Sequence, residues 1–350
     1  MARTSLLLAC AVVAAIVLTS NACKKKPKPE PKPKGERVLI IGGKSVLNEE
    51  ATSSIYAYNP KEKVLAKHEH ALPDARIDFG VVATGKKLFV LGGVLADASV
   101  ALDSLLYVDG TLTPSTAPET SKLASVALAH LGDSIYACGG SSGADDVDLT
   151  KACHVYSIEK NEWTKVDAEM PNAMAGAAAV PDGERYIYFV GGLTTNGVAR
   201  DTVSPFNAVQ RYDTQDKIWE LMKPMPQILA GVRAAHYSAA DGKGRLLACG
   251  SLGEQFPCFE YDVAANSWAE ATGLPEDEQL APQTPPQLVE CGGERLLVTA
   301  HDYDDESNSV RVLMRYDEPT KKFVSVEDVR HAEVTRGFQA VCYGEKEPAE

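Results

Sequence analysis

The chain carries no motif of a familiar catalytic or metal site. Its 350 residues contain no GxSxG nucleophile turn, no phosphate-binding loop and no HExxH metal motif. The seven histidines are scattered along the chain rather than paired at metal-ligand spacing. We therefore predict no catalytic residues, no metal and no cofactor. The residues best able to do chemistry are cysteines and a few arginines.

Four cysteines occupy two matching pairs of positions. Cys138 and Cys249 each directly precede a glycine, and Cys153 and Cys258 each lie three residues before a tyrosine. The same two sites on neighbouring strand-like segments are thus filled together twice. Small buried thiols would not explain this co-occurrence. The pattern predicts the cross-strand disulfides Cys138–Cys153 and Cys249–Cys258, which persist in an oxidising compartment.

Two further cysteines, Cys291 and Cys342, match each other in position within two other strand-like segments. They form a third disulfide if their Cα atoms are close enough, and stay separate thiols if the segments are too far apart. A zinc site is less expected, because no CxxC or paired-histidine spacing accompanies them.

The N-terminus has the composition of an export signal. A short positive segment is followed by nearly continuous apolar sequence from Leu6 to Thr19, and then by small residues before Cys23. This resembles a bacterial lipoprotein signal, which implies that residues 1–22 are removed and that Cys23 is lipidated. Ser20 departs from the usual leucine of that signal. The alternative is an ordinary secretory signal cut near Ala22, and under both interpretations the mature protein leaves the cytosol.

Residues 23–36 are predicted to be a spacer. They alternate lysine with proline, which favours an extended polyproline II chain of roughly 40 Å. The linker is basic, whereas the whole chain has a net charge of −13, so residues 37–350 are strongly acidic. An acidic domain repels phosphate backbones, which argues against nucleic acid as a partner.

Residues 37–350 repeat a pattern about every 50 residues. An apolar run ending in a glycine pair occurs at Gly42-Gly43, Gly92-Gly93, Gly139-Gly140 and Gly191-Gly192, with degenerate copies at Gly250-Ser251 and Ala300-His301. A tyrosine follows each run, at Tyr58, Tyr107, Tyr156, Tyr212, Tyr261 and Tyr316. Five of these tyrosines have an apolar residue seven places later, at Leu65, Trp163, Trp219, Trp268 and Phe323. Each unit is predicted to form four short strands.

This pattern resembles the kelch family of repeat proteins. The resemblance implies an all-β, six-bladed β-propeller over residues 37–350, in which neighbouring blades bury each other's faces. The first repeat lacks its innermost strand, and residues 336–344 supply an unused copy. We therefore expect the C-terminal strand to complete blade 1 and close the ring.

In kelch propellers, ligands bind where the innermost strands begin. Arg76, Asp78, Arg233, His236 and Arg336 fall at or near these positions. Arginines gathered there would hold carboxylates by paired hydrogen bonds. Structural ion pairs lining the channel are the alternative interpretation.

Two functions follow from these expectations. The first is a non-catalytic binding scaffold at the bacterial cell envelope, held by its lipid anchor as an outer-membrane lipoprotein, which recognises a protein or glycan through propeller loops. The second is a sugar-acting enzyme resembling sialic-acid mutarotases, with its site at the central channel.

Overall fold

The computed structural model describes residues 36–344 with gaps at 46–49, 86, 109–110, 121, 143–147, 196–202, 254, 272–285, 292, 299–309, 331–334 and 337. The predicted signal peptide, Cys23 and all of the predicted Lys/Pro-rich linker except Glu36 lie outside the described residues. No helix among the described residues is both long and apolar enough to cross a membrane.

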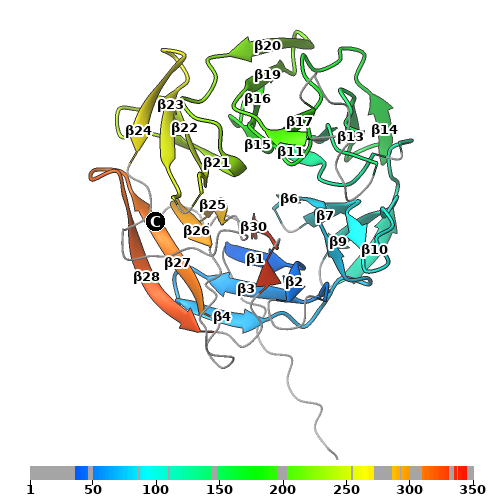
Figure 1. Cartoon of the computed structure of the whole chain (residues 1–350). Coiled ribbons are helices and arrows are strands. Elements are labelled where there is room, and N and C mark those ends of the chain that lie inside the picture. Colours follow the sequence, from blue (N-terminus) through cyan, green and yellow to red (C-terminus); the bar gives the residue numbers. More distant parts are fainter. Residues whose placement is uncertain are drawn as a thin grey trace, which may run out of the picture. The chain divides into compact units, whose positions relative to one another are not determined.

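The described residues form six four-stranded antiparallel sheets, each of which is one blade (Figure 1). From the innermost strand outward, blade 1 contains β30 (Gln339–Tyr343), β1 (Arg37–Ile41), β3 (Ile55–Asn59) and β4 (Val64–Lys67). Blade 2 contains β6 (Gly80–Thr84), β7 (Lys87–Leu91), β9 (Ser104–Val108) and β10 (Thr111–Ser115). Blade 3 contains β11 (Ala127–Leu131), β12 (Ser134–Cys138), β13 (Cys153–Ser157) and β14 (Glu162–Lys165). Blade 4 contains β15 (Ala178–Pro181), β16 (Tyr186–Val190), β19 (Val209–Asp213) and β20 (Ile218–Met222). Blade 5 contains β21 (Ala230–Ser238), β22 (Gly244–Ser251), β23 (Cys258–Asp262) and β24 (Ser267–Ala271). Blade 6 contains β25 (Gln287–Cys291), β26 (Glu294–Val298), β27 (Val310–Asp317) and β28 (Lys322–Arg330).

The innermost strands close into a ring. Each packs against its neighbour in the order β30, β6, β11, β15, β21 and β25, and β25 packs again on β30. Strand β30 pairs with β1, from Arg37 opposite Tyr343 to Ile41 opposite Gln339. The predicted six-bladed propeller, closed by the C-terminal strand in blade 1, is confirmed. The closing strand itself begins at Gln339, three residues after the predicted start at Arg336.

The seven-residue spacing between tyrosine and tryptophan has a structural cause. Tyr212 lies directly opposite Trp219 across the β19–β20 hairpin, and their ring centroids are 4.9 Å apart. A four-residue turn sets this pairing. In blade 2 the turn is shorter, and Leu112 lies opposite Tyr107 instead. The spacing therefore reports a cross-strand pair on the blade's outer half.

The core lies between blades. One cluster joins Ala129 and Cys138 of blade 3 to Ile187, Phe189 and Tyr212 of blade 4, all at most 5% exposed. A single sheet could not bury these side chains, so each blade needs its neighbour.

The glycine pairs permit close contact between blades at one end of the ring. Gly139 has a φ of 69°, and a Cβ there would lie 2.3 Å from the carbonyl oxygen of Met174. Only glycine tolerates both the backbone conformation and this approach.

The described residues contain three disulfides. Cys138–Cys153 and Cys249–Cys258 each join residues directly opposite on adjacent strands, at the pairings expected from the sequence. Cys291–Cys342 joins β25 of blade 6 to β30 of blade 1, with 5.2 Å between the Cα atoms. The two segments are therefore not too far apart for a third bridge, and this bond ties the closing strand to the last blade.

Candidate functional site

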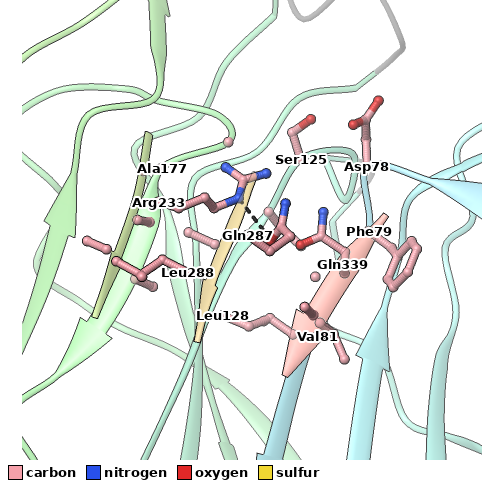
Figure 2. Close-up of a pocket in the computed structure, with 18 residues that line it drawn as sticks. Asp78, Phe79, Val81, Ser125, Leu128, Ala177, Arg233, Gln287, Leu288 and Gln339 are labelled. Atoms are coloured by element: carbon pink, nitrogen blue, oxygen red, sulfur yellow. Dashed lines mark hydrogen bonds between the residues drawn. The ribbon is translucent and has the colours of Figure 1, made fainter. Parts of the chain in front are cut away.

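A polar cavity of about 170 Å³ lies where the six innermost strands begin. We call this end of the channel the mouth. Its lining residues come from all six blades and are Asp78–Val81, Ser125–Leu128, Gly176–Ala179, Arg233, Ala234, Gln287, Leu288, Gln339 and Ala340. In the view of Figure 2, Arg233 lies to the left and Asp78 to the right, Gln287 and Gln339 lie below and between them, and the Asp78 carboxylate points upward, away from the two glutamines. Their strands belong to blades 5, 2, 6 and 1.

The rim of the mouth is shaped by left-handed backbone. Asp78, Ser125 and Gly176 have φ values of 52°, 52° and 62°. The Ser125 amide donates to the Asp78 carbonyl at 2.6 Å, and the Gly176 amide donates to the Ser125 carbonyl at 2.7 Å. These bonds link three successive blades, so the strand starts are fixed relative to one another.

Arg233 is held by neutral acceptors. Its Nε donates to the Gln287 Oε1 at 3.0 Å, and one terminal nitrogen donates to the Val232 carbonyl at 2.9 Å. Gln287 is 3% exposed, and its Nε2 finds no acceptor among the described residues. Burial lowers the pKa of the Arg233 guanidinium, and the nearby Asp78 charge opposes that shift.

Asp78 carries the opposite charge on the other side of the cavity. Burial raises the pKa of its carboxyl group, and the positive charge of Arg233 partly offsets this rise. Within the described part of the chain, its carboxylate makes no ion pair or hydrogen bond. The cavity thus holds one positive and one negative side chain that attract each other across its width without touching.

Arg76 does not line the cavity. Its side chain is fully buried, forms an ion pair with Asp103 at 2.9 Å and donates to the Gly92 carbonyl at 3.1 Å. Residues 76–77 form the short strand β5, which pairs with β8 (Val94–Leu95). Arg76 therefore braces the connection that follows the glycine pair of blade 2, and the structural interpretation fits it.

His236 also lies away from the mouth. It follows Arg233 by three residues on β21, and strand alternation places it on the opposite face of the sheet. Burial lowers its pKa, and the charges that oppose this are Asp182 and Glu184, at the turn between β15 and β16. The three-residue step along β21, about 10 Å at the usual rise per residue, separates His236 from Arg233 and the mouth.

Arg336 lies outside the closing strand. It belongs to β29 (Thr335–Arg336), which pairs with β2 (Lys44–Ser45) through Arg336 opposite Lys44. Its side chain is outside the described residues.

Sequence reasoning missed Gln287 and Gln339. Gln339 is paired with Ile41, the residue before a glycine pair, as Arg233 is paired with Cys249. The two residues therefore occupy equivalent sites at the start of innermost strands. Aligning the first residue of every innermost strand would have found Gln339.

The connections at the mouth are more elaborate than those at the other end. Two-stranded sheets β2–β29, β5–β8 and β17 (Leu193–Thr195)–β18 (Val203–Pro205) all lie in them. At the other end, turns of two to five residues join the strands. Long connections of this kind commonly carry recognition residues.

Exposed apolar side chains separate into two groups. Leu102, Ile228 and Leu252 are 56%, 55% and 42% exposed and lie on connections at the mouth. The others in the described residues lie on outermost strands, at Val64, Ile218, Leu221 and Val324. Leu102 lies on a connection of blade 2, and Ile228 and Leu252 lie on connections that lead into or belong to blade 5. We call the end of the ring that carries these three residues the mouth face.

Comparisons with known proteins agree with this architecture. Residues 34–251 match the family model described as the KLHDC2/KLHL20/DRC7 kelch-repeats domain. Kelch-like protein 25 of Xenopus tropicalis is 25% identical over 251 residues, covering 67% of this chain and 38% of that protein. Kelch-like protein 36 of Mus musculus is 28% identical over 208 residues, covering 57% of this chain and 32% of that protein.

A RING finger domain and kelch repeat-containing protein of Dictyostelium discoideum is 25% identical over 184 residues, covering 52% of this chain and 17% of that protein. The chain thus spans less than two fifths of the length of each of these relatives. Because the family model matches more than half of the chain, the protein belongs to the kelch-repeat family of β-propellers.

Proposed function

We propose that this protein is a binding scaffold at the bacterial cell envelope that recognises a protein partner through its mouth face. Kelch propellers are commonly protein-binding scaffolds. The observation that carries the proposal is the position of Leu102, Ile228 and Leu252, three exposed aliphatic residues on the connections around the channel.

These residues favour a protein over a glycan. Aliphatic side chains gain free energy when they are buried against another apolar surface. A protein partner offers such an apolar surface, and protein interfaces usually surround it with polar residues. The bracing of the blade 2 connection by Arg76 and Asp103 keeps the adjacent Leu102 in place, which limits the entropy lost on binding.

The envelope location rests on the N-terminal sequence and on the disulfides. Three disulfides favour an oxidising compartment. The signal-like segment, Cys23 and the extended linker would hold the propeller away from a membrane surface.

The partner proposal is tested by two matched triple variants. Leu102→Asp, Ile228→Asp and Leu252→Asp together are expected to reduce capture of envelope proteins by about tenfold or more, because hot-spot residues carry most of the binding free energy. Val64→Asp, Ile218→Asp and Leu221→Asp make the same chemical change on outer strands and are expected to leave capture intact. Equal capture by both variants, measured by crosslinking and quantitative mass spectrometry, would remove the mouth face as the binding surface.

The anchor is tested separately. Cys23→Ala is expected to move the protein from the detergent phase to the aqueous phase in detergent partition of whole cells, because the lipid is lost. Cys10→Ala, in the same signal segment, is the control and should keep the wild-type distribution. Detergent partition that is unchanged in Cys23→Ala would exclude lipidation at this residue.

The charged groups Asp78 and Arg233 in the channel favour a second candidate, the sugar-acting enzyme. An anomer-exchange assay on sialic acid should then show activity that Arg233→Ala abolishes. Exchange no faster than in buffer would exclude this candidate.

A further inference from the structure

The channel mouth contains donors that its own residues leave unused. Arg233 donates to two neutral oxygens, and no carboxylate among the described residues pairs with its guanidinium. The Gln287 Nε2 is buried and lacks an acceptor in the same part of the chain. The bond from Arg233 Nε to Gln287 Oε1 places the Gln287 amide beside the guanidinium group (Figure 2). Two neighbouring donor groups, one of them charged, therefore remain available to an acceptor.

The opposite side of the cavity carries a hydrogen-bond acceptor, the carboxylate of Asp78. Asp78 belongs to blade 2 and Arg233 to blade 5, so the ring separates them by two blades on either side. The Asp78 carboxylate accepts no hydrogen bond from the described residues, and Asp78 lines the same cavity. Among the described residues, Arg233 is the charge that acts on it. A ligand between them would meet donors at one end and a carboxylate at the other.

Charge balance limits the chemical class of ligand that suits this cavity. An anion alone would pair with Arg233 and leave Asp78 unpaired beside a second negative charge. A cation alone would leave Arg233 unpaired, and a neutral molecule would leave both charges without a counter-ion in a partly desolvated space. A zwitterion pairs with both.

The cavity also limits size. A cavity of about 150 Å³ accommodates a molecule as large as benzene, so the 170 Å³ here suits a ligand of roughly that size. We propose that the channel mouth binds a small zwitterion of the amino-acid type, with its carboxylate on Arg233 and Gln287 and its ammonium group facing Asp78. The site is separate from the mouth-face residues Leu102, Ile228 and Leu252.

Calorimetric titration of the purified protein tests the charge requirement. The probes are β-alanine and γ-aminobutyrate, which carry both charges, and propionate and propylamine, which each carry one. At least one zwitterion is expected to bind about tenfold more tightly than propionate or propylamine, a difference of about 1.4 kcal/mol. Zwitterions that bind no more tightly than the singly charged probes, or do not bind at all, would overturn the proposal.

Two variants assign the ends of the ligand. Asp78→Asn keeps size and backbone preference, and is expected to shift the preference from the zwitterion to propionate. Arg233→Gln is expected to shift it to propylamine. Glu162→Gln and Lys165→Gln on the exposed outer strand β14 remove the same charges and should leave binding unchanged. A zwitterion preference that survives both channel variants would place the ligand elsewhere.

Gln287→Met removes the unused donor at similar volume and is expected to weaken zwitterion and propionate binding without affecting propylamine. Thermal unfolding of each variant separates a lost fold from a lost contact. The mouth-face triple variant should keep zwitterion binding, so failure of the zwitterion and failure of the partner proposal are distinguishable.

Discussion

The buried negative charge of Asp78 lowers the stability of the folded protein. Burial raises the pKa of its carboxyl group above the value in the unfolded chain, so the folded state binds more protons at intermediate pH. Stability therefore falls as pH rises through the unfolded value of about 3.9 and levels off above the folded pKa. A group held at such a cost in a cavity is typical of a binding site.

We predict that Asp78→Asn stabilises the protein at neutral pH. Asparagine tolerates the left-handed φ of 52° at this position and removes the buried charge. The midpoint of thermal unfolding should rise by about 1–3 °C at pH 7, and the gain should disappear below about pH 3.5, where both states are protonated. A loss of stability at pH 7 would show that Asp78 is a structural ion-pair residue instead.

The sequence correctly predicted that Asp78 and Arg233 lie together at the mouth, but it also placed Arg76 and His236 there, and neither lines the cavity. The repeat register located Asp78 and Arg233, because Asp78 lies two residues before β6 and Arg233 lies near the start of β21. The repeat register did not exclude Arg76 from the cavity. The direction of the Arg76 side chain depends on its contact with Asp103, which lies 27 residues away in sequence. Gln287 was missed because its importance arises from Arg233, which orients its amide across a blade boundary.

Blades are joined through one recurrent contact between elements. The indole nitrogens of Trp163, Trp219 and Trp268 donate to the carbonyl oxygens of Thr116, Ala168 and Lys223, which lie on the preceding connection between blades. The distances are 2.7, 3.1 and 2.8 Å. Each tryptophan therefore packs on its own blade's tyrosine and pins the incoming chain.

We predict that Trp219→Phe lowers the free energy of unfolding by about 1 kcal/mol or slightly more, because the Ala168 carbonyl loses its partner while most ring packing remains. Denaturant unfolding measures the change. Ile218→Val, at the exposed neighbouring position, should cost almost nothing. Equal stability of Trp219→Phe and wild type would mean that the indole bond adds no net stability.

The sequence predicted these elements well because their signal is local. Cross-strand pairs such as Tyr212 and Trp219 lie within one hairpin. The sequence predicts strands of repeat 4 at residues 176–180, 186–191, 208–212 and 218–222, and the observed strands begin and end within two residues of these bounds. The short sheets at the mouth were not predicted. Strands such as β5 and β8 contain two residues each and exist only because the surrounding blade holds them together.

The whole ring depends on joining its two ends. Strand β30 completes blade 1, and Cys291–Cys342 ties it to blade 6 across 51 residues of sequence. Cys138–Cys153 closes a loop with a separation of only 15 residues within one blade. In the chain-entropy description, the longer loop constrains the unfolded chain more.

We predict that replacing Cys291 and Cys342 by alanine costs about 4 kcal/mol, compared with about 3 kcal/mol for the Cys138 and Cys153 pair. Denaturant unfolding of the two double variants compares them directly. The reverse order would show that the closing strand holds blade 1 without help from the disulfide.

Ring closure was expected from the missing first strand, but the Cys291–Cys342 bond was left open. The sequence places both cysteines on innermost strands, yet their separation depends on how tightly neighbouring blades pack at the centre. The observed 5.2 Å between Cα atoms follows from the whole ring rather than from either repeat.

We expect the mouth face to be the surface that this propeller presents to a partner. Covalent labelling of side chains, compared between intact envelopes and the purified protein, measures whether this surface is covered. Leu102, Ile228 and Leu252 should be protected in envelopes, while Val64, Ile218 and Leu221 should label equally in both. Protection confined to the outer strands, or none at the mouth face, would show that a partner does not bind there.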